Sequence, residues 1–275
     1  MKIAFKIEPS ANKNVELHLL IEVGDEDISF LIFSKTLFKV EGLYSLSLEK
    51  NTFPTDYIKE VANFVEQNSS LSAGSFSTTT IFYNFCTSTL IPLEYFKEEE
   101  KEEILAQLFV PDKMRTCFEE SCTDNDIKNI YSVPSAIHNT LLQKYPTAKF
   151  AHSTSFQVGK NNGSVLHCII YNASIKIILF KDGQLQIVQY FYYTTPTDVC
   201  YHLLNVAERF EIAPSSIKLI LSGMIDVDST LYQEVYKYFL KINFADNPDI
   251  NIAEGFMDSP SHFYHHLTAL ANAHN

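Results

Sequence analysis

Two stretches of the chain share one pattern, residues 164–181 (SVLHCIIYNASIKIILFK) and residues 15–34 (VELHLLIEVGDEDISFLIFS). In each, two apolar runs flank a short polar turn. Each first run contains a Leu-His pair and each second run ends in phenylalanine: Leu17-His18 with Phe33, and Leu166-His167 with Phe180. Short apolar runs rich in β-branched residues and bounded by turn residues favour strands. Each stretch is therefore predicted to form an antiparallel hairpin.

A third apolar run follows each hairpin, at residues 37–48 and 185–193. Apolar residues alternate with period two along the first of these runs, which predicts a strand. In the second half, Asp182-Gly183 separates the run from the hairpin, and Asp-Gly tolerates the positive φ angles of a tight turn. Each half is therefore expected to begin with a meander of three antiparallel strands.

The two halves then continue in the same way, with a Pro-Thr-Asp sequence at residues 54–56 and 196–198. Proline suits the first turn of a helix, and an aspartate just behind it complements the positive end of the helix dipole. Helical spacing of apolar residues follows, and then apolar runs at residues 76–83 and 217–223 predict a fourth strand. We therefore predict that residues 15–83 and 164–223 are two copies of one unit. In this alignment Leu17, Phe33, Ile58 and Val61 overlie Leu166, Phe180, Cys200 and Leu203.

The remaining segments complete an α/β chain of two domains, residues 1–156 and 157–275. Helices are predicted at 92–109, 134–144, 228–240 and 261–273, and strands at 129–133, 148–156 and 242–245. Segments 110–126 and 246–260 are rich in Asp, Asn, Ser and Pro, which predicts loops. A linker is expected at residues 157–163.

Two successive βββαβα units resemble the actin-like ATPase (ribonuclease H-like) fold of sugar kinases, heat-shock chaperones and actin. Three segments are also similar to domain-of-unknown-function family 3822, a group of bacterial proteins: Phe30–Phe33 (FLIF), Leu90–Glu94 (LIPLE) and Ile220–Gly223 (ILSG). The resemblance implies a fold of two duplicated actin-like domains, each with a mixed sheet. It implies no activity, because the family has none established.

In the actin-like superfamily a nucleotide lies in the cleft between the domains. The resemblance implies a phosphate loop (Asp-x-Gly, then Ser or Thr) in each domain and a Gly-Gly adenosine motif in the second. This chain keeps only five weak candidates for cofactor-binding residues: Glu22, Gly24, Asn172, Ser222 and Gly223. The first turn (EVGDED, residues 22–27) carries four carboxylates. These would repel a triphosphate by a few kcal/mol at an effective dielectric constant of about 20 unless metal ions intervened.

We therefore expect a non-catalytic actin-like protein that serves as a binding or scaffold protein, with degenerate phosphate loops and a protein partner. The alternative is a divergent nucleotide-binding protein or phosphotransferase that uses the inter-domain cleft, with acidic residues such as Glu22 ligating Mg²⁺. No cofactor and no catalytic residue is predicted.

A metal site is not expected either. Cys117 and Cys122 have no second cysteine pair and no nearby histidine, although zinc needs four ligands at familiar spacings. His262 and His266 have the i, i+4 spacing of a helical metal pair, but Phe263 stands where the zincin motif has glutamate. Packed or solvated histidines are the simpler interpretation.

Charge and hydropathy limit the partners. The net charge is −12, and the 21 basic residues are scattered, whereas nucleic-acid binding needs clustered Lys and Arg. No run is long enough to span a membrane and no targeting segment is evident, so we expect a cytoplasmic protein. The acidic run Glu98–Glu103 is either the solvated face of a helix or a docking site for a basic partner. The aromatic run Tyr190–Tyr193 would indicate a partner site if it were exposed.

Overall fold

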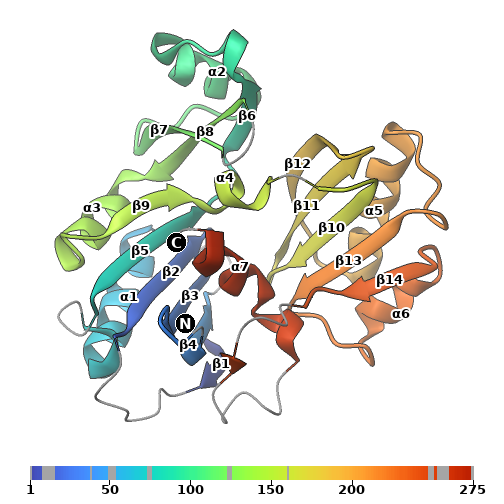
Figure 1. Cartoon of the computed structure of the whole chain (residues 1–275). Helices are drawn as coiled ribbons and strands as arrows, with labels where there is room; N and C mark the ends of the chain where they lie inside the picture. Colours follow the sequence, from blue (N-terminus) through green and yellow to red (C-terminus); the bar gives the residue numbers. More distant parts are fainter. Residues whose placement is uncertain are drawn as a thin grey trace. The chain divides into compact units, whose positions relative to one another are not determined.

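The computed structural model contains two compact units and describes the chain at residues 2–7, 16–37, 39–48, 54–72, 76–122, 126–159, 161–246, 251–252 and 260–273. Unit 1 comprises residues 1–157, 248–258 and 270–275, and unit 2 comprises residues 158–247 and 259–269 (Figure 1). Each unit has its own sheet and its own hydrophobic core.

Unit 2 shows the predicted plan in its simplest form. A meander of β10 (Val165–Ile170), β11 (Ser174–Lys181) and β12 (Gln184–Tyr192) is antiparallel throughout. Helix α5 (Pro196–Arg209) then crosses over to β13 (Lys218–Gly223), which pairs with β10 in parallel. Helix α6 (Thr230–Tyr236) leads to β14 (Lys241–Phe244), so the strand order is β12-β11-β10-β13-β14.

Unit 1 has the same strand order with additions at one edge. Its meander is β2 (His18–Gly24), β3 (Asp27–Ser34) and β4 (Lys39–Ser47), and α1 (Pro54–Gln67) leads to β5 (Thr78–Asn84), parallel to β2. Strand β9 (Lys149–His152) lies beyond β5. On the other side, β4 also pairs with β1 (Lys2–Ile7) and β15 (Asn251–Ile252), neither of which was predicted.

Two details of the register are common to both units. The pairing between the second and third meander strands shifts at the same place, between Ile32 and Phe33 in unit 1 and between Leu179 and Phe180 in unit 2. Helices α1 and α5 each begin at the proline of a Pro-Thr-Asp sequence and each contain 14 residues. In α5 the Thr195 hydroxyl accepts the Asp198 N–H, and the Asp198 carboxylate accepts the Thr195 N–H at 2.8 Å, a capping box that fixes the start of the helix.

The predicted equivalence of Leu17 with Leu166 is wrong. Phe33 lies opposite His18, and Phe180 lies opposite Val165. When the two phenylalanines are matched, Leu166 therefore corresponds to Leu19, and Leu17 precedes β2. The turns of the two hairpins are equally long, so the two Leu-His pairs lie at different positions of the repeated hairpin.

An insertion separates β5 from β9 in unit 1. It forms a second, three-stranded sheet of order β6-β8-β7, built from β6 (Ser88–Pro92), β7 (Arg115–Ser121) and β8 (Ile127–Pro134). Helix α2 (Lys101–Leu108) lies against β7, and α3 (Ser135–Lys144) follows β8 and packs on α1. Of the helix predicted at 92–109, only α2 is α-helical. The residues before Lys101 form two 3-10 turns, at 93–95 and 98–100, with irregular backbone between them. The predicted loop 110–126 contains β7.

The other predicted boundaries are shifted. Segment 148–156 consists of β9 and a short helix, α4 (Ser153–Gln157), and the helix predicted at 228–240 is limited to α6, which Ser229 caps. The C-terminal helix consists of a 3-10 turn at 261–263 followed by α7 (His265–Ala273). Segment 246–260 includes β15. Residues 247–250 and 253–259 of this segment lie outside the described residues, as do Phe38, Phe53 and Lys160. Within the described chain, no helix has both the length and the apolar character needed to cross a membrane.

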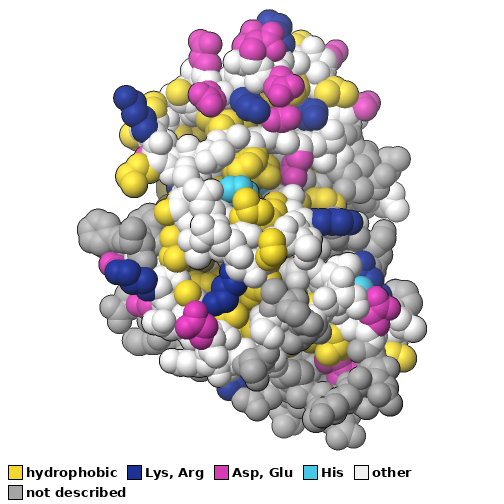
Figure 2. Space-filling view, turned by 90° about the vertical axis from the view of Figure 1, so that its left-hand side faces the viewer, with side chains coloured by type: hydrophobic (Ala, Val, Ile, Leu, Met, Phe, Trp, Pro, Cys, Tyr) yellow, Lys and Arg dark blue, Asp and Glu magenta, His cyan; other side chains and the backbone are white. Residues whose placement is uncertain are grey.

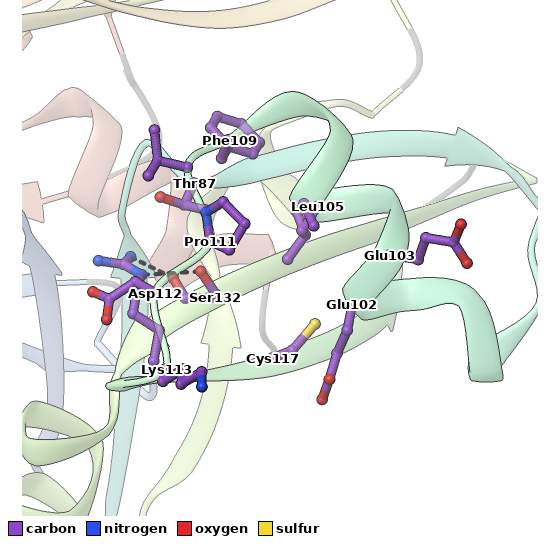
Figure 3. A pocket seen from close by; sticks show the side chains of 13 residues that line it. Thr87, Glu102, Glu103, Leu105, Phe109, Pro111, Asp112, Lys113, Cys117 and Ser132 are labelled. Atoms are coloured by element: carbon purple, nitrogen blue, oxygen red, sulfur yellow. Dashed lines mark hydrogen bonds between the residues drawn. The ribbon is translucent and has the colours of Figure 1, made fainter.

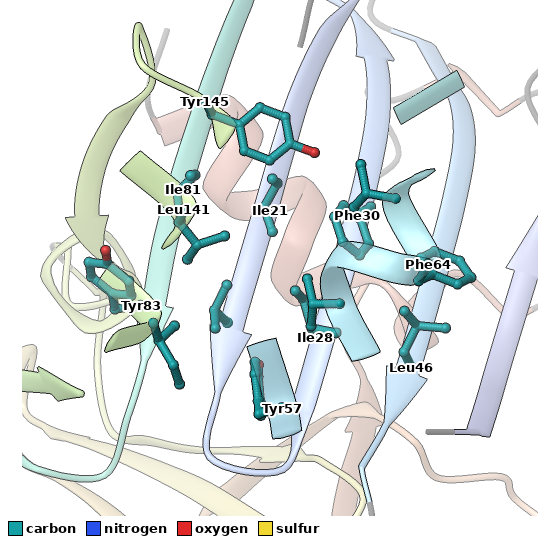
Figure 4. Close-up of a cluster of buried hydrophobic side chains, with 14 of the residues drawn as sticks. Ile21, Ile28, Phe30, Leu46, Tyr57, Phe64, Ile81, Tyr83, Leu141 and Tyr145 are labelled. Atoms are coloured by element: carbon teal, nitrogen blue, oxygen red, sulfur yellow. The ribbon is translucent and has the colours of Figure 1, made fainter. Parts of the chain in front are cut away.

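The core of unit 1 lies between its sheet and helices α1 and α3. Figure 4 shows Ile21, Ile28 and Phe30 of the meander facing Phe64 of α1 and Tyr145, which follows α3. Burying each such large apolar side chain contributes about 1.5–3 kcal/mol. In unit 2 the inward residues of β10, β11 and β13 pack in the same way against α5 and α6. In both units the candidate residues lie at or just beyond the carboxyl ends of the parallel strands.

Candidate functional site

The five predicted candidates fall into two groups, one in each unit. In unit 1, Glu22 and Gly24 lie at the carboxyl end of β2. The Glu22 side chain is buried, at a position that pairs with Ser29 of β3 and Phe82 of β5. Gly24 pairs with Asn84, and a Cβ built on Gly24 would lie 3.3 Å from the Asn84 carbonyl oxygen. Glycine here permits close approach of two strand ends.

The acidic turn after Gly24 is held by its own chain. The Asp25 carboxylate accepts the Cys86 backbone N–H at 3.1 Å, and the Glu26 carbonyl oxygen accepts the Leu48 N–H at 2.8 Å. The Tyr57 hydroxyl donates to the Asp27 carbonyl oxygen at 3.4 Å, and burial, together with Asp27 and Asp25, raises the pKa of Tyr57 well above its ordinary value. A phosphate loop presents N–H donors to its ligand, whereas this turn carries carboxylates and uses Asp25 to hold the segment after β5.

In unit 2, Asn172, Ser222 and Gly223 lie near one end of the sheet. Asn172 is exposed in the turn between β10 and β11, and Ser222 is buried near the end of β13. Gly223 pairs with Ile170 and has φ +84°, and a Cβ on it would lie 2.1 Å from the Ile170 carbonyl oxygen. Only glycine fits this position without backbone movement, so the backbone accounts for Gly223.

The histidines of the C-terminal segment are packing residues. His262 Nε2 donates to the Ile225 carbonyl oxygen at 2.6 Å, and its ring stacks on Phe244. The His266 ring packs edge-on against Tyr171, and burial lowers the pKa of His266 to about 3. Across the described residues, no three or more His, Cys, Asp or Glu side chains are grouped so as to hold a metal ion.

A groove of about 570 Å³ lies in the insertion between α2 and β7, and nothing in the sequence analysis predicted it (Figure 3). Glu102 and Glu103 of α2 lie along one side, and Val110 and Pro111 come from the segment after the helix. Cys117 of β7 also lines the groove, and burial raises the pKa of its thiol to about 11.

Two basic residues, Arg115 and Lys113, line the groove, and Arg115 is already engaged. The Arg115 guanidinium donates to the Ser132 carbonyl oxygen at 2.7 Å and to its hydroxyl at 3.0 Å, and it lies over the Phe85 ring. Arg115 therefore joins β7 to β8 and is held in place.

The surface around the groove is both apolar and acidic. Leu108, Val110 and Met114 are 60 %, 92 % and 74 % exposed. Residues 94–103 contain six glutamates against two lysines, and both lysines are paired, Lys97 with Glu100 and Lys101 with Glu119, each at 2.8 Å. Acidic side chains gather at the top of the molecule in Figure 2, the end at which Figure 1 shows α2. In the sequence, the acidic run Glu98–Glu103 was the feature that pointed to this surface.

The chain is similar in fold to several solved structures. A Bacteroides thetaiotaomicron protein of actin-like ATPase fold and unknown function is 22 % identical, with a TM-score of 0.72 over 87 % of this chain and 94 % of that one. A chain of the PilM–PilN type IV pilus biogenesis complex is 9 % identical, with a TM-score of 0.60 over 94 % of this chain and 98 % of that one. At these identities the likeness concerns the fold alone. No curated protein matches the sequence at a significant level.

The model of one protein family matches residues 7–242, which include the strands, helices and turns that carry all five candidates. That family is described as "Protein of unknown function (DUF3822)". The chain has an actin-like fold and belongs to domain-of-unknown-function family 3822.

Proposed function

We propose that the chain is a non-catalytic protein-binding member of the actin-like fold, and that the groove between α2 and β7 takes a basic, partly apolar segment of a partner protein. The groove carries this proposal, because the insertion of unit 1 combines a cavity, an exposed apolar edge and an excess of carboxylates. Interfaces of this kind bury an apolar centre and surround it with complementary charge.

The turns at the strand ends support the non-catalytic part of the proposal. The Asp25 carboxylate accepts a backbone N–H of its own chain, and Gly24 and Gly223 are accounted for by close backbone contacts. A phosphate brought to the turn Gly24–Asp27 would meet three successive acidic residues. The alternative, a nucleotide-dependent enzyme, requires metal ions to overcome that repulsion.

The chemistry of the groove itself favours binding over catalysis. Cys117 lines the groove together with Thr87, Ser132 and Lys113, and burial is the largest cause of the raised pKa of its thiol. A thiol with a pKa of about 11 is almost wholly protonated at neutral pH, while the thiolate is the reactive form. Cys117 therefore acts as an apolar lining residue.

The fold is compatible with this role. The similar solved structure from the PilM–PilN complex is a chain of a protein–protein assembly. A fold can be retained for its surfaces while its chemistry differs, and the insertion β6–β8 adds such a surface to unit 1.

The test begins with capture of stoichiometric partners from the native cell and continues with the purified partner. Its Kd is measured for the parent chain, for Glu102→Lys/Glu103→Lys and for Val110→Asp. Both variants change exposed side chains, so the fold is expected to persist. We expect each to weaken binding at least tenfold, and the charge reversal to reduce the salt dependence of Kd.

Glu208→Lys is the matched control, because Glu208 is an exposed glutamate on α5 of unit 2. Its Kd should stay within about twofold of the parent value, since surface substitutions away from an interface change little. A partner that binds the two groove variants as tightly as the control would show that the groove is not its site.

A further inference from the structure

The segment that joins α6 to β14 in unit 2 exposes a group of large apolar side chains. It reads VYKYFLKINFA over residues 235–245 and leads into β14, which forms one edge of the five-stranded sheet (Figure 1). Tyr236, Tyr238 and Leu240 are 55 %, 46 % and 64 % exposed. The described residues contain no other group of three exposed large hydrophobic side chains within five positions. Such side chains scattered singly are ordinary, whereas a group of them marks an interaction surface.

The same surface is basic. Lys237 and Lys241 are exposed within the segment, and Lys218 of β13, also exposed, is the register partner of Lys241. Residues 235–245 contain no acidic residue, although the net charge of the chain is −12. Lys237 pairs with Glu234 of α6, and a surface ion pair of this kind contributes little by itself. Its ammonium group can therefore exchange partners at small cost.

The core of unit 2 holds this segment in place. Phe239, between the exposed side chains, is fully buried in that core. The Tyr232 ring stacks on Tyr236 of the segment and on Phe244 of β14, with ring centroids 6.0 and 5.6 Å apart. A segment that is already ordered loses little conformational entropy when it binds.

This basic, apolar surface is complementary to the groove in unit 1. Leu108, Val110 and Met114 are exposed around the groove, and residues 94–103 carry six glutamates against two lysines. The groove volume of about 570 Å³ lies within the range of about 300–1,000 Å³ that is usual for ligand pockets. A space of that size suits a few side chains of a projecting turn. One chain thus carries both members of a complementary pair of surfaces.

We propose that the groove between α2 and β7 of one copy takes residues 236–241 of a second copy of this chain. The inference rests on the proposed function, because it names the basic, partly apolar segment that the groove takes. The tyrosine and leucine side chains would cover the apolar edge, and the lysines would face Glu102 and Glu103. Complementary charge of this kind fixes the register of an interface and speeds association.

The contact joins two different surfaces, so each copy can use its groove and its segment at the same time. Such head-to-tail contacts form a closed oligomer where the rotation between copies closes, and an open filament where it does not. Self-association should therefore increase with protein concentration and depend equally on both surfaces.

The experiment is sedimentation equilibrium of the full chain over a range of concentrations. It compares the parent with Glu102→Lys/Glu103→Lys and Lys237→Glu/Lys241→Glu, which change exposed side chains. We expect the parent to form oligomers and each variant to associate at least tenfold more weakly, because like charges then face each other. Mixing the two variants should restore association, since each finds the opposite charge on the other. One chain with all four substitutions should regain it as well.

Lys59→Glu/Lys149→Glu is the matched control, because both lysines are exposed on unit 1 and their reversal changes the net charge by the same amount. It should associate as the parent does. Circular dichroism and thermal unfolding check that every variant is folded.

A parent that stays monomeric at every accessible concentration overturns this inference. A mixture of the two variants that associates no better than either alone overturns it equally. The proposed function fails separately, when a captured partner binds Glu102→Lys/Glu103→Lys as tightly as it binds the parent. A monomeric parent whose captured partner is lost from that variant would assign the groove to a segment of another protein and not to a second copy.

Discussion

Gly223 and Ile170 meet where the parallel strands β13 and β10 end, and their contact leaves no room for a side chain. A Cβ on Gly223 would lie 2.1 Å from the Ile170 carbonyl oxygen, and Gly223 has φ +84°. The same oxygen accepts the Met224 N–H at 2.8 Å. The residue that resembled part of an adenosine motif is thus required by the backbone of unit 2.

Gly223→Ala should lower the free energy of unfolding by about 2–4 kcal/mol. About 1–2 kcal/mol comes from a non-glycine residue in the left-handed region, and the rest from displacing the Ile170 carbonyl. Gly163→Ala is the control, because Gly163 has φ +89° with no atom within 4 Å of the added Cβ, so it should lose only the first part. Urea denaturation measures both, and equal losses would show that the close contact costs nothing.

The stability of unit 2 should fall as the pH drops below about 6.5. Burial lowers the pKa of His266 to about 3 and that of His167 to about 4, with His265 and Lys176 adding to the first and His265 and Lys218 to the second. These side chains stay neutral in the folded unit, whereas an unfolded histidine takes up a proton near pH 6.5. The free energy of unfolding should therefore decrease by up to about 1.4 kcal/mol per pH unit for each histidine.

This pH effect is measured as urea midpoints at pH 7.5 and pH 5.5, above the range in which most carboxylates titrate. His266→Gln should make the dependence shallower, because one of the two groups no longer titrates. Midpoints that are equal at the two pH values would contradict the burial of both imidazoles as neutral groups.

Cys117 should react slowly with alkylating reagents. Its pKa of about 11 leaves roughly one thiol in a thousand ionised at pH 8, about a hundredfold fewer than for a free thiol of pKa near 8.5–9. Peptide mapping after timed iodoacetamide treatment measures the rate for Cys117, with urea-unfolded protein as the reference. Alkylation as fast in the folded protein as in the unfolded one would point to a nucleophilic groove and against the binding role.

Local patterns in the sequence predicted the parts of the fold that short segments specify. The helices beginning at Pro54 and Pro196 were found because proline and aspartate mark a helix start, and the Asp182-Gly183 turn was found because it needs positive φ, which both residues have. Strand β7 was missed because the polar sequence RTCFEES lacks alternation and is held by pairing with β8. Strands β1 and β15 add to β4 from distant parts of the chain, which no local pattern reveals.

The candidate residues at the strand ends could be located from the sequence, whereas the groove could not. Glu22 and Gly223 could be located because each lies at the end of a predicted strand, although the reason for Gly223 is a contact with Ile170, 53 positions earlier in the chain. The groove could not be predicted, since its lining comes from Thr87, Ser132 and the segment 102–117. Only the β7–β8 pairing and the position of α2 bring these residues together.

Calorimetric titration of the full chain with ATP and excess Mg²⁺ tests most directly whether this actin-like fold has lost its nucleotide chemistry. Three successive acidic residues follow Gly24, and the Asp25 carboxylate already accepts the Cys86 N–H, so we predict no binding tighter than about 10 μM, roughly 7 kcal/mol. A tighter, Mg²⁺-dependent Kd that Glu22→Gln abolishes would contradict the account and establish the chain as a nucleotide-binding protein.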